Sequence, residues 1–436
     1  MLKRKKIIKV KMYMKKKILM MLAMVMTVMT ASAKIDGYKL DVVKSEGDKG
    51  TITFVVDGKA AEYAVAGKTV TVKIVDVTSG YAAKAITVKA YSEWGAAKAR
   101  QTRGGIGLLD AIETTKVKLN EYTFVMPEAN VEVSAEYTLS AHVEAEEDKE
   151  GGKEVKDVNL EMAIMEGTTP TVENGITVIE VAITGIDVPQ QAGKKEITVE
   201  IPAEMLSADG KTKFVVKKIN KDAFKTPDGS NAVVTKVILP ETDEPIIIEK
   251  GALSPNGEPI SLVVPLSMLD DYALMETLKD NFEAMKISAI VTPANRLWTF
   301  ACGVDVFLPE GVKAYTCFIP YDVEVQITEI PANKLQVNGK NVILANNGVL
   351  FANDSGKGGT YEIVARPGRQ ASGIKPSTND AKDYGEKNWL EPVIVGKHYP
   401  AGEYLVLKDN EFHEIEDNAS LTPACKAIFH KKNMNK

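Results

Sequence analysis

Apolar and polar positions alternate in short runs from about residue 34 onward. The runs Tyr38–Val43, Thr51–Val56 and Thr69–Ile74 place every second side chain on one face, which is typical of half-buried strands. Asp57 and Gly58 directly follow one run and suit a tight hairpin turn. Residues 34–138 are therefore predicted to form a small antiparallel β domain.

A different pattern occupies residues 159–295, where one short phrase occurs twice. Ile219-Asn-Lys-Asp-Ala-Phe224 and Ile248-Glu-Lys-Gly-Ala-Leu253 share an Ile-x-x-x-Ala-Phe/Leu pattern. Extended segments that end in proline follow them, Val237–Pro240 and Leu262–Pro265. Such units bury their apolar edges only by stacking on their neighbours, so the pattern predicts a short solenoid.

This segment resembles the leucine-rich repeats of bacterial surface antigens of the BspA-like type. The resemblance extends upstream through Ile197–Pro202 and Gly210–Val216. It implies a short leucine-rich-repeat solenoid over residues 159–295 that presents an extended binding surface.

One helix is expected at the end of this segment. Ser267 to Asp270 fits a capping box, and apolar residues recur at helical spacing from Leu269 through Phe282 to Met285. We expect this helix to cap the last repeat.

The flanking regions carry two further resemblances. Residues 122–137 resemble the closing signature of divergent internalin B-repeat modules, except for an insertion near 94–111. Residues 296–436 carry short apolar runs between turns and resemble a carboxy-terminal β module of secreted proteins from host-associated Gram-negative anaerobes. That module is predicted to be all-β, with an exposed loop over 363–393. The fold class expected for the whole chain is mainly β.

Residues 139–158 are rich in charge and contain glycine, with almost no large apolar side chains. A segment of this composition cannot bury enough surface to order itself, so it is predicted to be a charged linker.

The N-terminus predicts export. Lys15–Lys17, the apolar run Ile18–Met26 and the Ala31-Ser-Ala33 site form a signal peptide over residues 1–33, and a start at Met14 would make 1–13 an over-extended start. The apolar run is shorter than a membrane-spanning helix requires, and no transmembrane segment is expected in the mature chain. We expect the protein to be secreted, on the cell surface or in the periplasm.

Removal of the signal changes the charge balance. Nine of the 54 Lys and Arg residues leave with it, so 45 remain against 59 Asp and Glu, a net charge of −14. An acidic surface of this kind repels phosphate backbones, which argues against nucleic-acid binding.

The sequence predicts no catalytic, cofactor-binding or metal-ligating residues. Its four histidines form no His-Glu-x-x-His motif, and neither a Gly-x-Ser-x-Gly elbow nor a phosphate-binding glycine loop is present. We therefore expect a protein that is not an enzyme and uses no cofactor. A hydrolase of unrecognised type remains an alternative, since carboxylate pairs meet only in space.

Three cysteines, Cys302, Cys317 and Cys425, allow one disulfide and one free thiol in an exported chain. Cys302 and Cys317 flank a predicted strand-turn-strand and form the favoured pair, although three pairings remain open. Burial as free thiols is the alternative.

Trp94 and Trp389 border predicted loops, where an exposed indole could stack on a sugar ring. Burial against the parent domain is the alternative for both. The sequence thus favours a non-catalytic adhesion protein that engages an extracellular protein or glycan, and a secreted glycan-binding accessory protein is the second hypothesis.

Overall fold

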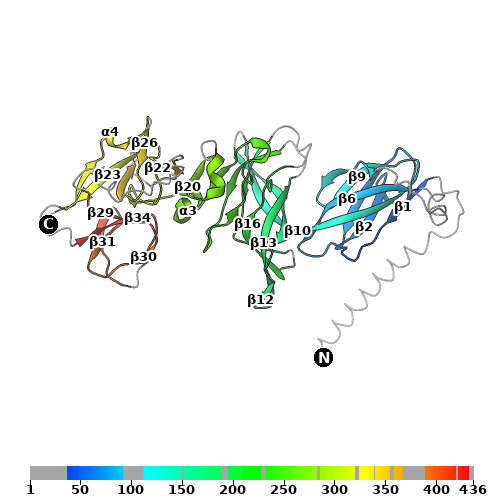
Figure 1. Ribbon diagram of the computed structural model, residues 1–436, viewed down its shortest axis with the longest axis horizontal. Coiled ribbons are helices and arrows are strands. Elements are labelled where there is room, and N and C mark those ends of the chain that lie inside the picture. Colours follow the sequence, from blue (N-terminus) through cyan, green and yellow to red (C-terminus); the bar gives the residue numbers. More distant parts are fainter. Residues whose placement is uncertain are drawn as a thin grey trace, which may run out of the picture.

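The computed structural model describes most of the chain after the expected signal peptide. The described residues are 37–91, 111–149, 152–188, 195–207, 209–226, 232–281, 285–319, 324–337, 339–353, 358–366, 388–418 and 421–431. Their fold is mainly β, as predicted, and its modules follow one another in a row (Figure 1). The expected signal peptide, Trp94 and most of the expected loop 363–393 lie outside the described residues.

The first module consists of two sheets that enclose one core. The first sheet has the order β3 (Lys59–Ala60), β2 (Thr51–Val56), β5 (Thr69–Val75), β9 (Glu121–Val125) and β8 (Thr115–Lys118). The second contains β4 (Tyr63–Ala64), β1 (Tyr38–Val42), β10 (Asn130–Lys149), β6 (Tyr81–Tyr91) and β7 (Ala111–Ile112).

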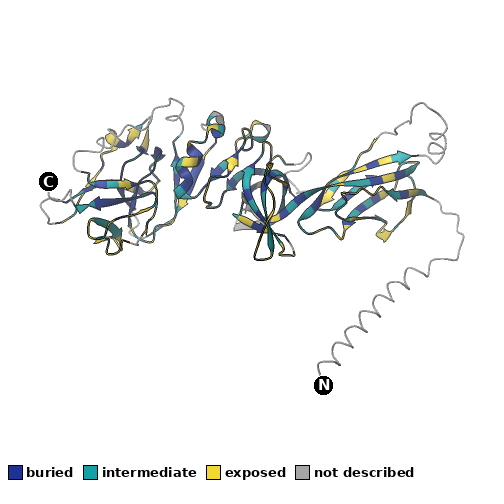
Figure 2. Ribbon diagram, turned by 60° about the horizontal axis from the view of Figure 1, so that its bottom comes forward, coloured by how far each residue is buried: buried dark blue, intermediate teal, exposed yellow. Residues whose placement is uncertain are grey.

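Buried and more exposed residues alternate along these strands (Figure 2). This alternation places Val70 and Val133 in the shared core, as the sequence predicts. The module is not purely antiparallel, because β1 runs parallel to β10.

The predicted charged linker over 139–158 is wrong: its described residues, 139–149 and 152–158, lie in two paired strands. Strand β10 pairs with β11 (Gly152–Ile164) from Leu139↔Met162 to Lys149↔Gly152. Leu139, Ala141 and Val143 alternate inward, and the neighbouring strands satisfy the backbone hydrogen bonds. The charged composition alone did not predict strands here, because the strands that pair with this segment come from other parts of the sequence.

Two ladders of parallel strands follow these paired strands. The first ladder contains β13 (Ile176–Asp187), β16 (Thr212–Ile219) and β18 (Ile247–Ile248). The second ladder contains β14 (Lys195–Glu200), β17 (Ala232–Ile238), β19 (Ser261–Val263) and β20 (Ile287–Val291). Strands β12 (Thr171–Glu173) and β15 (Glu204–Leu206) pair antiparallel with the first ladder.

The repeated phrase occupies equivalent positions in the first ladder. Ile219 pairs with Ile248, and Ala223 and Ala252 are both fully buried. Asp222 and Gly251 both adopt left-handed backbone conformations, with φ of 59° and 88°, so the same turn recurs. The assignment of these ladders to a leucine-rich-repeat solenoid stays a prediction.

A different element pairs with each end of the two ladders. At the first end, β11 pairs with β13 and β10 pairs with β14, so these two paired strands bridge both ladders. At the far end, β20 pairs with β28 (Tyr361–Ala365), which makes the second ladder continuous with the C-terminal module. The C-terminal module thus covers an edge that would otherwise carry unpaired backbone groups.

The predicted helix is much shorter than its spacing indicated. Its α-helical part, α3, spans only Leu269–Ala273, between the 3-10 turns η2 (Leu266–Met268) and η3 (Glu276–Asn281). The capping box is not formed, because the Ser267 hydroxyl donates to Glu241 Oε1 at 2.8 Å. Even so, the Thr277 hydroxyl donates to the carbonyl of Ile248 at 2.6 Å. The segment thus supplies a hydrogen-bond donor to a backbone carbonyl in the last strand of the first ladder.

The C-terminal module is built almost wholly from short strands. One sheet has the order β21 (Leu297–Phe300), β27 (Val349–Asn353), β23 (Val312–Phe318) and β24 (Gln326–Glu329). Another has the order β29 (Leu390–Val393), β34 (Lys426–His430), β31 (Tyr404–Lys408) and β32 (Glu411–Glu414). The remaining described elements are β22 (Val306–Phe307), α4 (Ala332–Leu335), β25 (Gln336–Val337), β26 (Lys340–Ile343), β30 (Lys397–His398) and β33 (Leu421–Thr422).

Candidate functional site

A pocket in the C-terminal module is a candidate site among the described residues. It has a volume of about 510 Å³, within the usual range for small-molecule sites. Strands β31 to β34 and Thr299 of β21 supply most of its wall. The lining residues are Thr299, Val406, Leu407, Lys408, His413, Glu414, Ile415, Glu416, Asp417, Leu421, Thr422, Pro423, Lys426, Ala427 and Ile428.

Lys426 is the distinctive group of this pocket. Alternation along β34 places Lys426 and Ile428 on one face of the strand and Ala427 and Phe429 on the other. Burial lowers the pKa of the Lys426 ammonium, because a desolvated cation is disfavoured. No carboxylate of a described residue forms a salt bridge with Lys426.

The wall of the pocket combines acidic and apolar groups. Glu414, Glu416 and Asp417 bring carboxylates, and Glu414 also forms an ion pair with Lys431. Ile415 and Ile428 contribute apolar surface from the small core that contains Tyr399. A pocket of this kind can accept hydrogen bonds from hydroxyl groups while it packs against a carbon framework.

Of the two tryptophans singled out from sequence, Trp389 is described and does not line this pocket. Trp94 lies outside the described residues. Trp389 is partly buried, its ring meets that of Phe318 edge-on at 6.1 Å between centroids, and its backbone nitrogen donates to the carbonyl of Cys317 at 2.8 Å. Trp389 therefore packs on its own module, which was the alternative to sugar stacking.

The structure does not bring together the favoured cysteine pair. All three cysteines are buried free thiols, but Cys302 belongs to the core of the ladders and Cys317 to a separate cluster with Leu350 and Phe429. The thiol of Cys302 contacts Cys425 instead. Spacing along the chain suggested the wrong neighbour because β34 returns beside β21 from more than 120 residues away.

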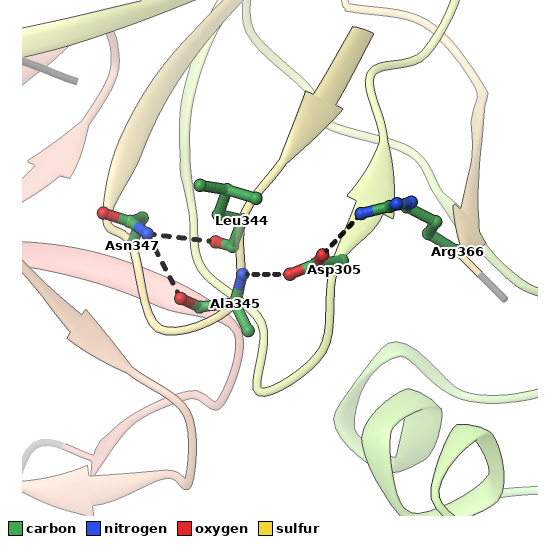
Figure 3. Close-up of polar contacts among 5 residues, drawn as sticks. All are labelled: Asp305, Leu344, Ala345, Asn347 and Arg366. Atoms are coloured by element: carbon green, nitrogen blue, oxygen red, sulfur yellow. Dashed lines mark hydrogen bonds and ion pairs between the residues drawn. The ribbon is translucent and has the colours of Figure 1, made fainter. Parts of the chain in front are cut away.

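A buried ion pair beside the pocket module has a structural role. Asp305 accepts hydrogen bonds from the backbone nitrogen of Ala345 at 2.9 Å and from Nη1 of Arg366 at 3.1 Å (Figure 3). Asn347 donates to the carbonyls of Leu344 and Ala345 in the same loop. Both carboxylate oxygens of Asp305 are thus bonded, one to the loop at Ala345 and one to Arg366, which directly follows β28.

Neither Lys426 nor the pocket was found from the sequence. A single lysine at the start of a predicted strand does not indicate a binding site in the sequence. The pocket forms only where β31 to β34 meet Thr299.

Comparison of the chain with protein-family models, curated proteins and solved structures gave no significant match. Within the described ranges, no cluster of three or more His, Cys, Asp or Glu side chains is arranged to hold a metal ion. The described helices are too short or too polar to cross a membrane.

Proposed function

We propose that this chain is an exported, non-catalytic binding protein that engages an extracellular protein or glycan through the outer face of its parallel ladders. The observation that carries the proposal is the in-register stacking of Ile183, Ile219 and Ile248, whose side chains all face the core. Alternate residues of the same strands face outward at the interstrand spacing of about 4.8 Å. The stacking thus creates a regular extended surface, which is the property that repeat proteins use for binding.

The outer face of the first ladder has the mixed chemistry of a recognition surface. Val215 and Lys213 alternate with the buried Phe214 and Val216 on β16, so they lie on the outer side. Ile247 is 54% exposed and pairs in register with Lys218. Apolar groups beside charged ones suit contact with another macromolecule.

The signal-peptide pattern, which predicts export, and the leucine-rich-repeat resemblance support this proposal from the sequence. Cleavage after Ala33 is expected, and intact-mass analysis of extracellular material tests it. Recovery from the cell exterior of a chain that retains Met14 to Ala33 would contradict the proposed processing.

The binding experiment uses residues 34–436 on arrays of host proteins and glycans. A hit is then measured with the variants Val215→Glu and Ile247→Asp, which change only outward side chains. Val125→Asp is the matched control, because Val125 is also an exposed strand residue but lies on the first module. Loss of affinity in the ladder variants alone supports the proposal, and loss only in the control contradicts it.

A second candidate function is recognition of a sugar unit in the pocket. The lysine with a lowered pKa, the three carboxylates and the apolar walls favour a small polyhydroxylated ligand over a flat protein surface. The test is a glycan array probed with the unmodified chain and with Lys426→Met and Glu416→Gln. Signals lost in both variants but kept in Val215→Glu and Ile247→Asp would assign recognition to the pocket.

Catalysis is the outcome that would overturn both proposals. Hydrolysis of a peptide or glycan library that disappears on changing one carboxylate of the pocket would define an enzyme instead.

A further inference from the structure

We propose that Cys302 and Cys425 form a disulfide that fastens the loop after β21 to the start of β34, and that Cys317 stays a free thiol. Sequence spacing left three pairings open, and the tertiary arrangement distinguishes them. The inference does not depend on the proposed binding function.

The backbones around the two residues run side by side. The backbone nitrogen of Ala301 donates to the carbonyl of Cys425 at 3.4 Å, and that of Ala427 donates to Thr299 Oγ1 at 3.2 Å. These contacts hold residues 299–302 against 425–427, where Cys425 adopts a left-handed backbone conformation with φ of 58°. A disulfide requires Cα atoms within about 4.4 to 6.8 Å, a separation that adjacent segments provide.

The side chains also meet. The Cys302 thiol lies close enough to the Cys425 thiol to raise its pKa, and each residue is only 3% exposed. The Cys425 thiol also lies 3.2 Å from the carbonyl oxygen of Leu266, at the start of the turn before α3. A bond between the two sulfurs would therefore join the C-terminal strand to the core beneath the end of the ladders.

Cys317 lacks such a partner. It is fully buried on β23, among Leu350, Leu390 and Phe429, in a different cluster from Cys302. Burial raises the pKa of the Cys317 thiol to about 12, so the reactive thiolate is scarce. The fold thus provides one pair and one inert thiol.

The reaction needs an external oxidant of the disulfide class, such as oxidised glutathione. Cys302 and Cys425 each lose the proton of their thiol and a sulfur–sulfur bond forms between them. The two electrons reduce the disulfide of the oxidant, which leaves as two thiols. Because both sulfurs are buried in the final fold, we expect exchange to finish before the core closes.

The test is oxidative refolding of residues 34–436 in a glutathione redox buffer, followed by alkylation under denaturing conditions and mass spectrometry. We expect a mass lower by two hydrogens, a single alkylated cysteine at Cys317, and one cross-linked peptide that contains Cys302 and Cys425. Cys317→Ala should keep the cross-link, whereas Cys302→Ala and Cys425→Ala should lose it.

Thermal unfolding provides a second measurement on the unmodified sequence. Adding a thiol reductant should lower the unfolding midpoint of the oxidised protein. The same reductant should leave the unfolding midpoint of the Cys302→Ala variant unchanged. A cross-link between Cys302 and Cys317, or three alkylated thiols after oxidative refolding, would overturn the proposal.

Discussion

The phenol oxygen of Tyr272 accepts a hydrogen bond of 2.9 Å from the backbone nitrogen of Ile246. Tyr272 lies on α3 and is fully buried, and Ile246 directly precedes β18, the last strand of the first ladder. One side chain therefore satisfies a backbone donor at the end of the ladder. The contact shows how a single turn of helix closes a stack that a long helix was expected to close.

Tyr272→Phe should remove this acceptor and leave the Ile246 nitrogen buried without a partner. The cost of an unsatisfied buried donor is about 1–3 kcal/mol of the free energy of unfolding. Denaturant titration measures it, with Tyr63→Phe as the control because Tyr63 is exposed. Equal stability of the two variants would show that the hydrogen bond does not stabilise the end of the ladder.

Phe224→Asp should destabilise the protein strongly. Phe224 is 1% exposed in the core of the ladders, so the variant loses aromatic packing and buries a carboxylate. We expect a loss of at least about 3 kcal/mol. Lys225→Asp is the matched control on the adjacent exposed residue and should change little; a comparable loss there would contradict the inward placement of Phe224.

Asp305→Ala should be costly because it breaks a buried ion pair. The variant leaves the Arg366 charge without its partner and the Ala345 nitrogen without its acceptor. Removal of one partner of such a pair typically costs about 3–5 kcal/mol. The exposed pair of Asp57 and Lys68 supplies the control, since Lys68→Ala should cost about 1 kcal/mol or less in the same denaturant titration.

Lys426→Met should keep or increase stability while it changes the pocket. Burial disfavours the charged ammonium, so the pKa of Lys426 is lower in the folded chain than in the unfolded chain. Charging this group therefore opposes folding below its lowered pKa, and the penalty disappears as pH rises toward the ordinary value near 10.5.

The free energy of unfolding, measured from neutral to alkaline pH, checks this prediction. The unmodified protein should gain stability relative to Lys426→Met as pH rises. Lys408→Met, at an exposed lysine of the same pocket, should show no such trend. A Lys426→Met variant that is less stable at neutral pH than the unmodified chain would mean that the ammonium stabilises the fold.

Much of the local structure follows from local pattern. Alternation in Thr51–Val56 predicts a strand because period two matches the pleat, and the Asp57-Gly58 turn adopts the positive φ that this dipeptide tolerates. The repeated phrase predicts the equivalence of Ala223 and Ala252, because identical spacing gives identical turns that stack.

Tertiary structure decided the features that depend on distant partners. The described parts of the charge-rich segment, 139–149 and 152–158, form paired strands because β13 and β14 provide their neighbours. The open edge of β20 is covered by β28, more than 70 residues later. Cys302 meets Cys425 for the same reason. By itself the sequence determined which faces are apolar and where the chain turns; which strands pair, and so where the pocket and the thiol pair lie, depended on long-range packing that no local pattern encodes.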